Sequence, residues 1–285
     1  MTTQLVHTRK ELRAARDALS GRVAVVMTMG ALHPGHAQLI AQARQDADSV
    51  VVTIFLNPLQ FAAGEDLSRY PRTLESDLAI CREQGVDLVF APTPDVMYPD
   101  GEPGIRVSAG ALGAVLEGSS RPGHFDGVLT VVAKLFHLVR PDLAYFGQKD
   151  AQQLLLIRRM ATDLDFPIEV IAVPTVREDD DLAMSSRNVY LTSTDREAAL
   201  SLSRALRAGE AQAVRGPAAI RRAARDVLVG EPLAQVDYLV LVDPVRLEEV
   251  PEWYHGVAIL AVAAKVGTTR LIDNLPITVG PVAPA

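Results

Sequence analysis

The sequence predicts an α/β protein: a Rossmann-like, doubly wound parallel sheet, followed by a smaller C-terminal α+β domain of helices and a short antiparallel sheet. Apolar, β-branched runs alternate with helical patterns through the first two thirds of the chain, which is typical of a parallel sheet with crossover helices. Runs such as VVVTIFL lack polar alternation, so these strands should be covered on both faces. Near residue 175 the pattern changes to long helices followed by strand-like runs. We therefore expect two domains, over residues 1–175 and 176–285.

Strands and helices should alternate in the first domain. Runs rich in apolar and β-branched residues predict five strands, Val23–Met29, Val50–Leu56, Asp87–Ala91, Asp142–Phe146 and Ile168–Val173. Apolar residues at helical spacing between these runs predict helices near residues 36–47, 72–84, 124–139 and 151–164.

The second domain should contain two helices and three strands. Thr194 and Glu197 have the spacing of a capping box, which predicts a helix from there to about Val214, and a second helix should span 217–229. Three strand-like runs follow, Val236–Val242, Val257–Ala264 and Thr269–Asp273. The Lys265–Thr268 link predicts a hairpin between the last two.

Composition and charge indicate a soluble, globular protein. Of the 285 residues, 48% are hydrophobic and 22% are charged. The net charge of -7 argues against a surface that binds nucleic acid, although a local group of Lys and Arg can still meet a small anion. Cys81 is the only cysteine, which excludes internal disulfides and Cys-based zinc sites and fits a reducing cytosol. No run approaches the ~18 apolar residues of a membrane span, and the charged N-terminus does not resemble a signal peptide. We expect a cytoplasmic protein.

The first candidate site is MTMGALHPGHAQLI, residues 27–40, at the turn from the first strand to the first helix. His33 and His36 stand on either side of Pro34–Gly35, and Gly30 permits a close approach of the backbone. The two imidazoles can bind a phosphate, begin a metal site, or only cap and pack the helix. A helix N-terminus carries partial positive charge and no third His or Cys lies nearby in sequence, so phosphate is favoured over metal.

The second candidate, Asn57-Pro58-Leu59-Gln60-Phe61, directly follows the strand VVVTIFL. Ligands of open α/β sheets bind beyond the carboxyl ends of the strands, where the amide of Gln60 can bond to hydroxyl or carbonyl groups. A proline turn in which Asn57 and Gln60 satisfy nearby backbone explains the same residues. Taken alone, the segment favours the turn.

The third candidate is another strand-to-helix turn, Phe146–Gln153. Lys149 can contact a phosphate while Asp150 and Gln153 face the same crevice. Alternatively, Asp150 caps the helix and Gln153 closes a capping box, which leaves Lys149 unexplained.

The fourth candidate is Met184-Ser185-Ser186-Arg187-Asn188, near the expected domain boundary. Its hydroxyl and guanidinium groups suit phosphate oxygens, and a loop at a domain junction can close over a ligand. A solvated loop would need no function, because so short a motif often occurs by chance. Three of the four candidates follow predicted strands and three offer donors to an anion, so together they predict a nucleotide site.

Several segments together resemble the pantothenate synthetase, or pantoate–β-alanine ligase, family, within the nucleotidyltransferase superfamily whose mark is the HxGH turn, here His33–His36. The resemblance covers nearly the whole chain, and the order and spacing of its segments are far more specific than any one of them. These segments are TMGALHPGH, IFLNPLQF, DLSRYPRTLESDL, LEGSSRPGHFDGVLTVVAKLF, FGQKDAQQL, VREDDDLAMSSRN and GTTRLIDN.

The resemblance implies a reaction in two steps, as part of pantothenate and coenzyme A biosynthesis. The carboxylate of (R)-pantoate attacks the α-phosphorus of ATP and releases pyrophosphate. The amine of β-alanine then attacks the pantoyl adenylate and releases AMP and pantothenate. The resemblance also implies Mg²⁺ as cofactor, a homodimer, and a smaller domain that acts as a lid.

The family motifs imply roles for individual residues. ATP should contact Met29, Gly30, His33, His36, Gly147, Lys149, Asp150, Val176, Met184, Ser185, Ser186 and Arg187. Four of these should be catalytic, namely His36, His33, Lys149 and Arg187, with His36 either transferring a proton or only donating a hydrogen bond to developing charge. The substrates pantoate and β-alanine should be held by Gln60, Gln153 and Met29. Asp77 matches a position near Mg²⁺, and Glu117 and Arg121 belong to a flap over the site.

Three positions depart from the family pattern. Met27 stands where a proline is usual before Thr-Met-Gly, which changes backbone stiffness but removes no contact group. Asp181 stands where a glycine is common, so the aspartate must adopt positive φ if the loop requires it. Ser76 stands where some members have a second aspartate, which weakens the magnesium assignment of Asp77.

Two other functions fit parts of the pattern. A nucleotidyltransferase that leaves the nucleotide on its product would use the same HxGH turn, and a non-catalytic sensor would bind ATP without forming pyrophosphate. Gln60 and Gln153 favour the ligase, because neutral amides suit a hydroxy acid better than a phosphorylated substrate. The sensor is disfavoured by the presence of His33, His36, Lys149 and Arg187.

Overall fold

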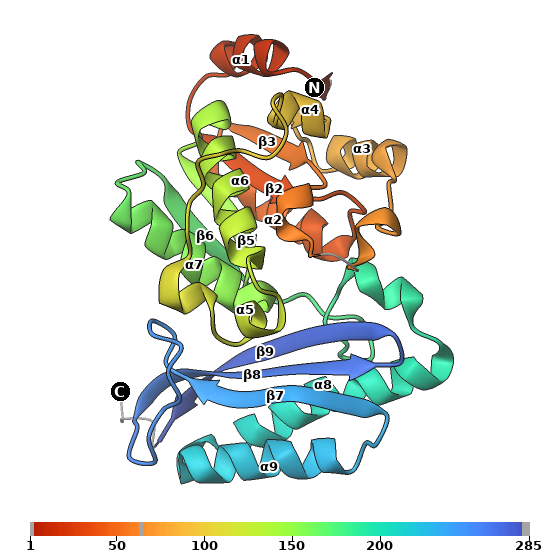
Figure 1. The fold of residues 1–285 in the computed structure, drawn as a ribbon, viewed down its shortest axis with the longest axis vertical. Helices are drawn as coiled ribbons and strands as arrows, with labels where there is room; N and C mark the ends of the chain where they lie inside the picture. Colours follow the sequence, from red (N-terminus) through yellow and green to blue (C-terminus); the bar gives the residue numbers. More distant parts are fainter. Residues whose placement is uncertain (1–2, 63–64, 281–285) are drawn as a thin grey trace. The chain divides into compact units, whose positions relative to one another are not determined.

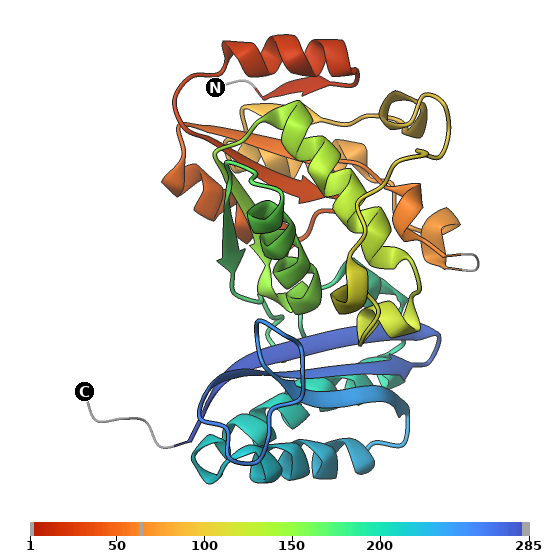
Figure 2. The ribbon, with the colours of Figure 1, turned by 60° about the vertical axis from the view of Figure 1, so that its left-hand side comes forward.

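The computed structural model describes residues 3–62 and 65–280. The chain folds into two compact units, each with most of its contacts within itself (Figures 1 and 2). Unit 1 comprises residues 1–148 and 152–174, and unit 2 comprises residues 149–151 and 175–285. The predicted fold class is confirmed, because unit 1 contains a parallel sheet with helices and unit 2 contains helices and an antiparallel sheet.

The sheet of unit 1 is six-stranded and parallel, in the order β1-β4-β3-β2-β5-β6. Its strands are β1 (Gln4–Val6), β2 (Val23–Thr28), β3 (Ser49–Ile54), β4 (Leu88–Phe90), β5 (Leu143–Gly147) and β6 (Glu169–Val173). All five predicted strands are present. The short strand β1 was not predicted, because only one of its three residues is buried and it carries no pattern. Met27, one of the three departures from the family pattern, lies within β2 and pairs with Thr53, so it falls inside a regular strand.

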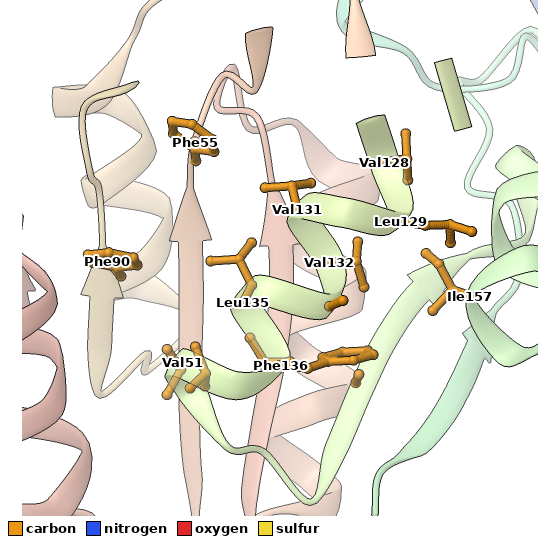
Figure 3. Packing of buried hydrophobic residues seen from close by; sticks show 14 of the residues in the cluster. Val51, Phe55, Phe90, Val128, Leu129, Val131, Val132, Leu135, Phe136 and Ile157 are labelled. Atoms are coloured by element: carbon orange, nitrogen blue, oxygen red, sulfur yellow. The ribbon is translucent and has the colours of Figure 1, made fainter. Parts of the chain in front are cut away.

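Helices cover both faces of this sheet. They are α1 (Arg9–Ala18), α2 (Pro34–Asp46), α3 (Leu74–Glu83), α4 (Pro94–Met97), α5 (Glu117–Ser120), α6 (His124–Val139) and α7 (Ala151–Asp163). Successive strand residues face opposite sides, so Val25 packs in one core cluster with α6, and Val26 in another with α2. Figure 3 shows Val131 and Leu135 of α6 over the first of these faces. No helix in the described part of the chain is long and apolar enough to span a membrane.

The order of the strands defines a switch point. From β2 the chain moves outward to β3 and β4, and it then returns to place β5 on the other side of β2. In such sheets ligands bind beyond the carboxyl ends of the strands where the direction reverses. Here these ends are the segments after Thr28 and Gly147, which adjoin because Val26 pairs with Tyr145.

Unit 2 contains α8 (Ser193–Glu210) and α9 (Pro217–Val229), and an antiparallel sheet of β7 (Ala234–Val242), β8 (Gly256–Val266) and β9 (Thr269–Val279). The predicted hairpin is confirmed, since Val266 pairs with Thr269 across Gly267, whose φ is 58°. Strand β9 runs beyond the predicted end at Asp273. Aspartate and proline are rare in strands, but Pro276 is tolerated because β9 is an edge strand.

The predicted start of α8 was wrong. Its N-cap is Thr192, and the capping box closes with Asp195, not between Thr194 and Glu197. Two overlapping Thr-x-x-acid patterns occur here, and the structure uses the earlier one, which lengthens the helix at its start. The helix ends at Glu210, before the expected Val214, and a short 3₁₀ turn follows.

Candidate active site

His33 and His36 cap each other at the start of α2. His33 is the N-cap residue, and its Nδ1 accepts a hydrogen bond from the Gly35 N–H at 3.1 Å. The Nδ1 of His36 accepts one from the His33 N–H at 3.3 Å, and the ring centroids lie 4.0 Å apart. Capping, one of the roles left open by the sequence, is therefore present.

This capping determines which ring nitrogen of each histidine carries the proton. A neutral imidazole has one donor and one acceptor, so rings that accept at Nδ1 hold their proton at Nε2. Each ring can cap through one nitrogen and donate to an anion through the other. The capping and phosphate-binding roles of His33 and His36 are thus compatible. The described residues contain no group of three His, Cys, Asp or Glu arranged to hold a metal.

Asp77 does not fit the role of magnesium ligand. Its Oδ2 accepts from the Ala31 N–H at 3.1 Å, while Oδ1 accepts from the Leu32 N–H at 2.8 Å and the Thr73 hydroxyl at 3.1 Å. The side chain is only 1% exposed. A protein-bound Mg²⁺ keeps several of its waters, and a carboxylate so enclosed by donors has no room for a hydrated ion.

A hydrogen-bond network orients the amide of Gln60. Asn57 caps the short 3₁₀ turn Pro58–Gln60, and its Nδ2 donates to Gln60 Oε1 at 3.0 Å. The hydroxyl of Tyr98 donates to Asn57 Oδ1 at 2.9 Å, and burial raises the pKa of that hydroxyl, which keeps it a donor. Gln60 Nε2 lies 3.2 Å from Met29 Sδ. Two of the predicted substrate-binding residues, Gln60 and Met29, therefore lie side by side, and the donor end of the amide faces Met29.

Arg121, the C-cap residue of α5, holds the backbone of the same turn. The carbonyl of Gln60 accepts from His124 Nδ1 at 2.8 Å and from Arg121 Nη2 at 3.2 Å. Arg121 also forms a two-point ion pair with Glu65, at 2.6 and 2.8 Å. A Cβ on Gly127 would lie 2.2 Å from the Leu59 carbonyl oxygen, so α6 approaches this turn as closely as only glycine allows.

The glutamine that the sequence singled out in α7 differs from the one that is buried. Gln152 is buried, accepts from the Glu117 N–H at 3.1 Å and donates to the carbonyls of Leu112 and Val115 at 2.9 Å. It thereby holds the start of α5. Gln153 is only partly buried, and Asp150 is exposed.

In unit 2, the predicted phosphate-binding residues lie in one braced loop. The Val176 carbonyl accepts from the Met184 N–H at 2.9 Å, and Ser185 Oγ accepts from the Arg187 N–H at 3.2 Å. Asn188 Nδ2 donates to the Ala183 carbonyl and to Glu178. Met184, Ser185, Ser186 and Arg187 are all partly exposed, as a ligand-binding loop requires.

Arginines brace the acidic run before this loop. Glu178 and Asp180 both pair with Arg196, at 2.7 and 2.8 Å. Arg177 forms a bidentate ion pair with the buried Asp273, in which Nη1 donates to Oδ2 at 2.7 Å and Nη2 to Oδ1 at 2.9 Å. Burial raises the pKa of the Asp273 carboxyl, and the guanidinium opposes this shift. The sequence did not indicate the Arg177–Asp273 pair, which joins residues far apart in the chain.

Lys149 belongs to the part of the 148–150 turn that groups with unit 2. Its carbonyl accepts from Asn274 Nδ2 at 2.7 Å. Its ammonium group acts on Asp273 by charge and opposes the rise in the pKa of that carboxyl. The side chain is partly exposed, so it retains access to an anion.

Asp181 has a φ of 69°, in the left-handed region that favours glycine. Aspartate tolerates this region better than most residues, and ion pairs with Arg177 and Arg207 support it here. Asp181→Ala should lower the free energy of unfolding by about 1–2 kcal/mol, because it loses both pairs and retains the strained backbone. Asp181→Gly should remain within about 0.5 kcal/mol of the wild type, because relief of strain offsets the loss of the pairs. Urea titration measures both, and equal destabilisation by the two variants would contradict the role of φ.

The chain is similar to known proteins over nearly its whole length. The family model described as Pantoate-beta-alanine ligase matches residues 3–276. A pantothenate synthetase from Thermobifida fusca is 57% identical over 286 residues, covering 97% of this chain and 96% of the relative. The crystal structure of pantothenate synthetase from Thermus thermophilus has a TM-score of 0.91 and 50% identity, covering 98% of this chain and 100% of that one. A pantoate-beta-alanine ligase from Francisella tularensis, complexed with beta-gamma ATP and beta-alanine, has a TM-score of 0.80 and 33% identity, covering 96% and 97%.

Proposed function

The chain belongs to the pantoate-beta-alanine ligase family, and from this premise we propose that it condenses pantoate with β-alanine at the expense of ATP, through the residues described above. In the first step a carboxylate oxygen of pantoate bonds to the α-phosphorus of ATP, and the bond to the bridging oxygen of pyrophosphate breaks. In the second step the amine of β-alanine attacks the acyl carbon of the adenylate. AMP leaves with the pantoate oxygen, the amine loses a proton, and the amide of pantothenate remains.

The observation that carries the assignment of the first step is the reciprocal capping of His33 and His36. It leaves the proton of each ring at Nε2, at the switch point of the sheet where an anion is expected. Two such donors stabilise the negative charge that grows on the departing pyrophosphate, and they need little reorganisation because the backbone already fixes both rings. Met29 and Gly30 line the same turn.

Pantoate is a hydroxy acid, and the Gln60 amide is suited to bind it. Asn57 occupies Gln60 Oε1, so Nε2 is the end that donates to the substrate's hydroxyl or carboxylate oxygens. Met29 offers an apolar surface beside it for the aliphatic part of pantoate. Gln153 is proposed to complete the binding of the acid.

The remaining charge of the triphosphate requires cations and further donors. We assign Lys149, Ser185, Ser186 and Arg187 to the phosphates, because ammonium, hydroxyl and guanidinium groups all donate to phosphate oxygens. Magnesium is expected to arrive with ATP, neutralising its phosphates, rather than on a dedicated protein carboxylate.

We extend the family assignment to four further features: the nucleoside contacts, the lid, the oligomeric state and the location. Val176 and Asp150 are proposed to contact the nucleoside part of ATP, with unit 2 acting as the lid. A homodimer is proposed on the resemblance. A cytoplasmic location is proposed on the resemblance and on the single, buried Cys81, which fits a reducing compartment. Gel filtration with light scattering tests the dimer.

An oxygen-transfer experiment tests the route through an adenylate. Pantoate labelled with ¹⁸O in both carboxylate oxygens should deliver one label to AMP and retain the other in the amide carbonyl of the product. Mass spectrometry of AMP reads this directly. Unlabelled AMP would contradict the adenylate, and a nucleotidyltransferase would leave the nucleotide on its product without releasing AMP.

Gly147, at the end of β5, gives a test of the nucleotide's position. Apart from Gly147 and its two chain neighbours, no described residue has an atom within 4 Å of the place where its Cβ would be, so Gly147→Ala should not disturb the protein itself. If ATP passes closely over this position, the methyl group should raise KM for ATP about tenfold, since overpacking by one methyl costs about 1–3 kcal/mol. The unfolding temperature should not change. An unchanged KM for ATP would place the nucleotide elsewhere.

A further inference from the structure

The turn that carries His33 and His36 is held in an unusual backbone conformation. Gly30 and Ala31 both have positive φ, 86° and 51°. For alanine this conformation costs about 1–2 kcal/mol. The turn therefore requires support from outside itself.

The carboxylate of Asp77 supplies that support. Successive backbone N–H groups next to a left-handed residue form a concave pair of donors that binds anions. Here the pair is the N–H groups of Ala31 and Leu32, and the anion is the buried Asp77 carboxylate, at 3.1 and 2.8 Å. A Cβ on Gly30 would lie 3.1 Å from Asp77 Oδ2, so the carboxylate lies directly against the turn.

The carboxylate is itself held in place. Thr73, the N-cap residue of α3, donates its hydroxyl to Asp77 Oδ1 at 3.1 Å. Asp77 lies in the first turn of α3, where the helix dipole stabilises a negative charge. The Asp77 side chain therefore ties the start of one helix, α3, to the turn that begins another, α2.

We propose that Asp77 is a positioning residue for adenylation: it holds the Gly30–Leu32 turn so that His33 and His36 present their Nε2 donors to the departing pyrophosphate. This inference rests on the proposed function of the two histidines. The turn amides hold a side-chain carboxylate, so the phosphate contacts fall to the rings. Asp77 acts on the reaction through the backbone and not through magnesium.

Asp77→Asn tests this proposal. One oxygen becomes an NH₂ group that faces a backbone N–H, so the turn should shift. A displacement of about 1 Å at a catalytic group can lower the rate by about 10²-fold. We therefore expect kcat, measured as pyrophosphate release, to fall by about 10- to 100-fold. KM for ATP and for pantoate should change little, because the misplaced histidine donors stabilise the transition state rather than the bound substrates. The Mg²⁺ concentration that gives half-maximal activity should be unchanged.

A magnesium ligand would give a different result. Its loss should raise the half-saturating Mg²⁺ concentration severalfold, and excess Mg²⁺ should then restore turnover. That outcome would overturn the proposal, and so would wild-type turnover in Asp77→Asn. The wild-type enzyme separates the two hypotheses: absence of pyrophosphate release from ATP and pantoate would refute the proposed function, not the role of Asp77.

A rescue variant keeps the test independent of folding. Ala31→Gly removes the cost of positive φ, so the double variant Asp77→Asn/Ala31→Gly should recover part of the turnover. Thr73→Val, which removes the hydroxyl donor, should show a smaller loss in the same direction. Asp87→Asn is the matched control, since Asp87 also accepts from a backbone N–H, that of Val50, at the opposite end of the strands. It should lower stability without lowering turnover. Failure of the rescue together with wild-type turnover in Thr73→Val would contradict the proposal.

Discussion

Replacing His36 with asparagine should lower the rate of pantoyl adenylate formation by about 10²-fold or more, the range expected when one transition-state donor is removed. Asparagine has a side-chain oxygen at about the position of Nδ1, so it can still accept from the His33 N–H, which His36 accepts at 3.3 Å. It has no group at the position of Nε2. The unfolding temperature should therefore stay within about 2 °C of the wild type.

His36→Ala and His33→Asn complete this series. His36→Ala removes both the cap and the donor. Its rate of adenylate formation should fall by the same factor as that of His36→Asn, and its free energy of unfolding should fall by about 1 kcal/mol. Asparagine is among the best N-cap residues, so His33→Asn should keep or raise the free energy of unfolding. Its rate of adenylate formation should fall, because the Nε2 donor is absent. Rapid-quench measurement of pyrophosphate release, paired with thermal unfolding, reads both effects. Wild-type pyrophosphate release in His36→Asn would refute the assigned role of Nε2.

Arg177→Met should produce the largest loss of stability, about 3–5 kcal/mol, because it leaves the carboxylate of Asp273 buried without its partner. Asp273 is only 4% exposed and receives two hydrogen bonds from this guanidinium. Arg196→Met is the matched control. Its ion pairs with Glu178 and Asp180 are about a third exposed, and their removal should cost about 1 kcal/mol or less. Urea titration compares the two.

The loss in Arg177→Met should depend on pH in a defined direction. Burial raises the pKa of Asp273 in the folded protein above its ordinary value, and removal of the guanidinium takes away the main opposing influence. A raised folded-state pKa means that the neutral carboxyl is favoured, so the variant should be most stable at low pH and lose stability as pH rises through that pKa. The gap to the wild type should narrow at acid pH. A loss at neutral pH no larger than that of Arg196→Met would contradict the account of a buried pair.

Local patterns predicted most of the architecture. The alternation of apolar runs and helical patterns predicted β2, β3 and α6 because each is a long, strongly biased segment. The HPGH turn was predicted as a helix start because a helical pattern begins there. Helix α1 was missed although Thr8 and Glu11 form a capping box that the sequence displays, so a local signal was available there.

The contacts that define the site could not be predicted in this way. Asp77 and Ala31 lie 46 residues apart, and Arg177 and Asp273 lie 96 apart, so no local period relates them. The orientation of the Gln60 amide depends on Asn57, whose own orientation depends on a distant tyrosine hydroxyl. Individual residue types were visible in the sequence, but their partners follow only from the fold.

The most direct test of the central claim is a coupled assay with purified protein, ATP, Mg²⁺ and pantoate, run with and without β-alanine. Pantoate alone should release about one equivalent of pyrophosphate per active site and little free AMP, because the adenylate stays bound. Addition of β-alanine should start steady release of AMP and pantothenate in equal amounts. AMP formation that depends on neither pantoate nor β-alanine would contradict the account.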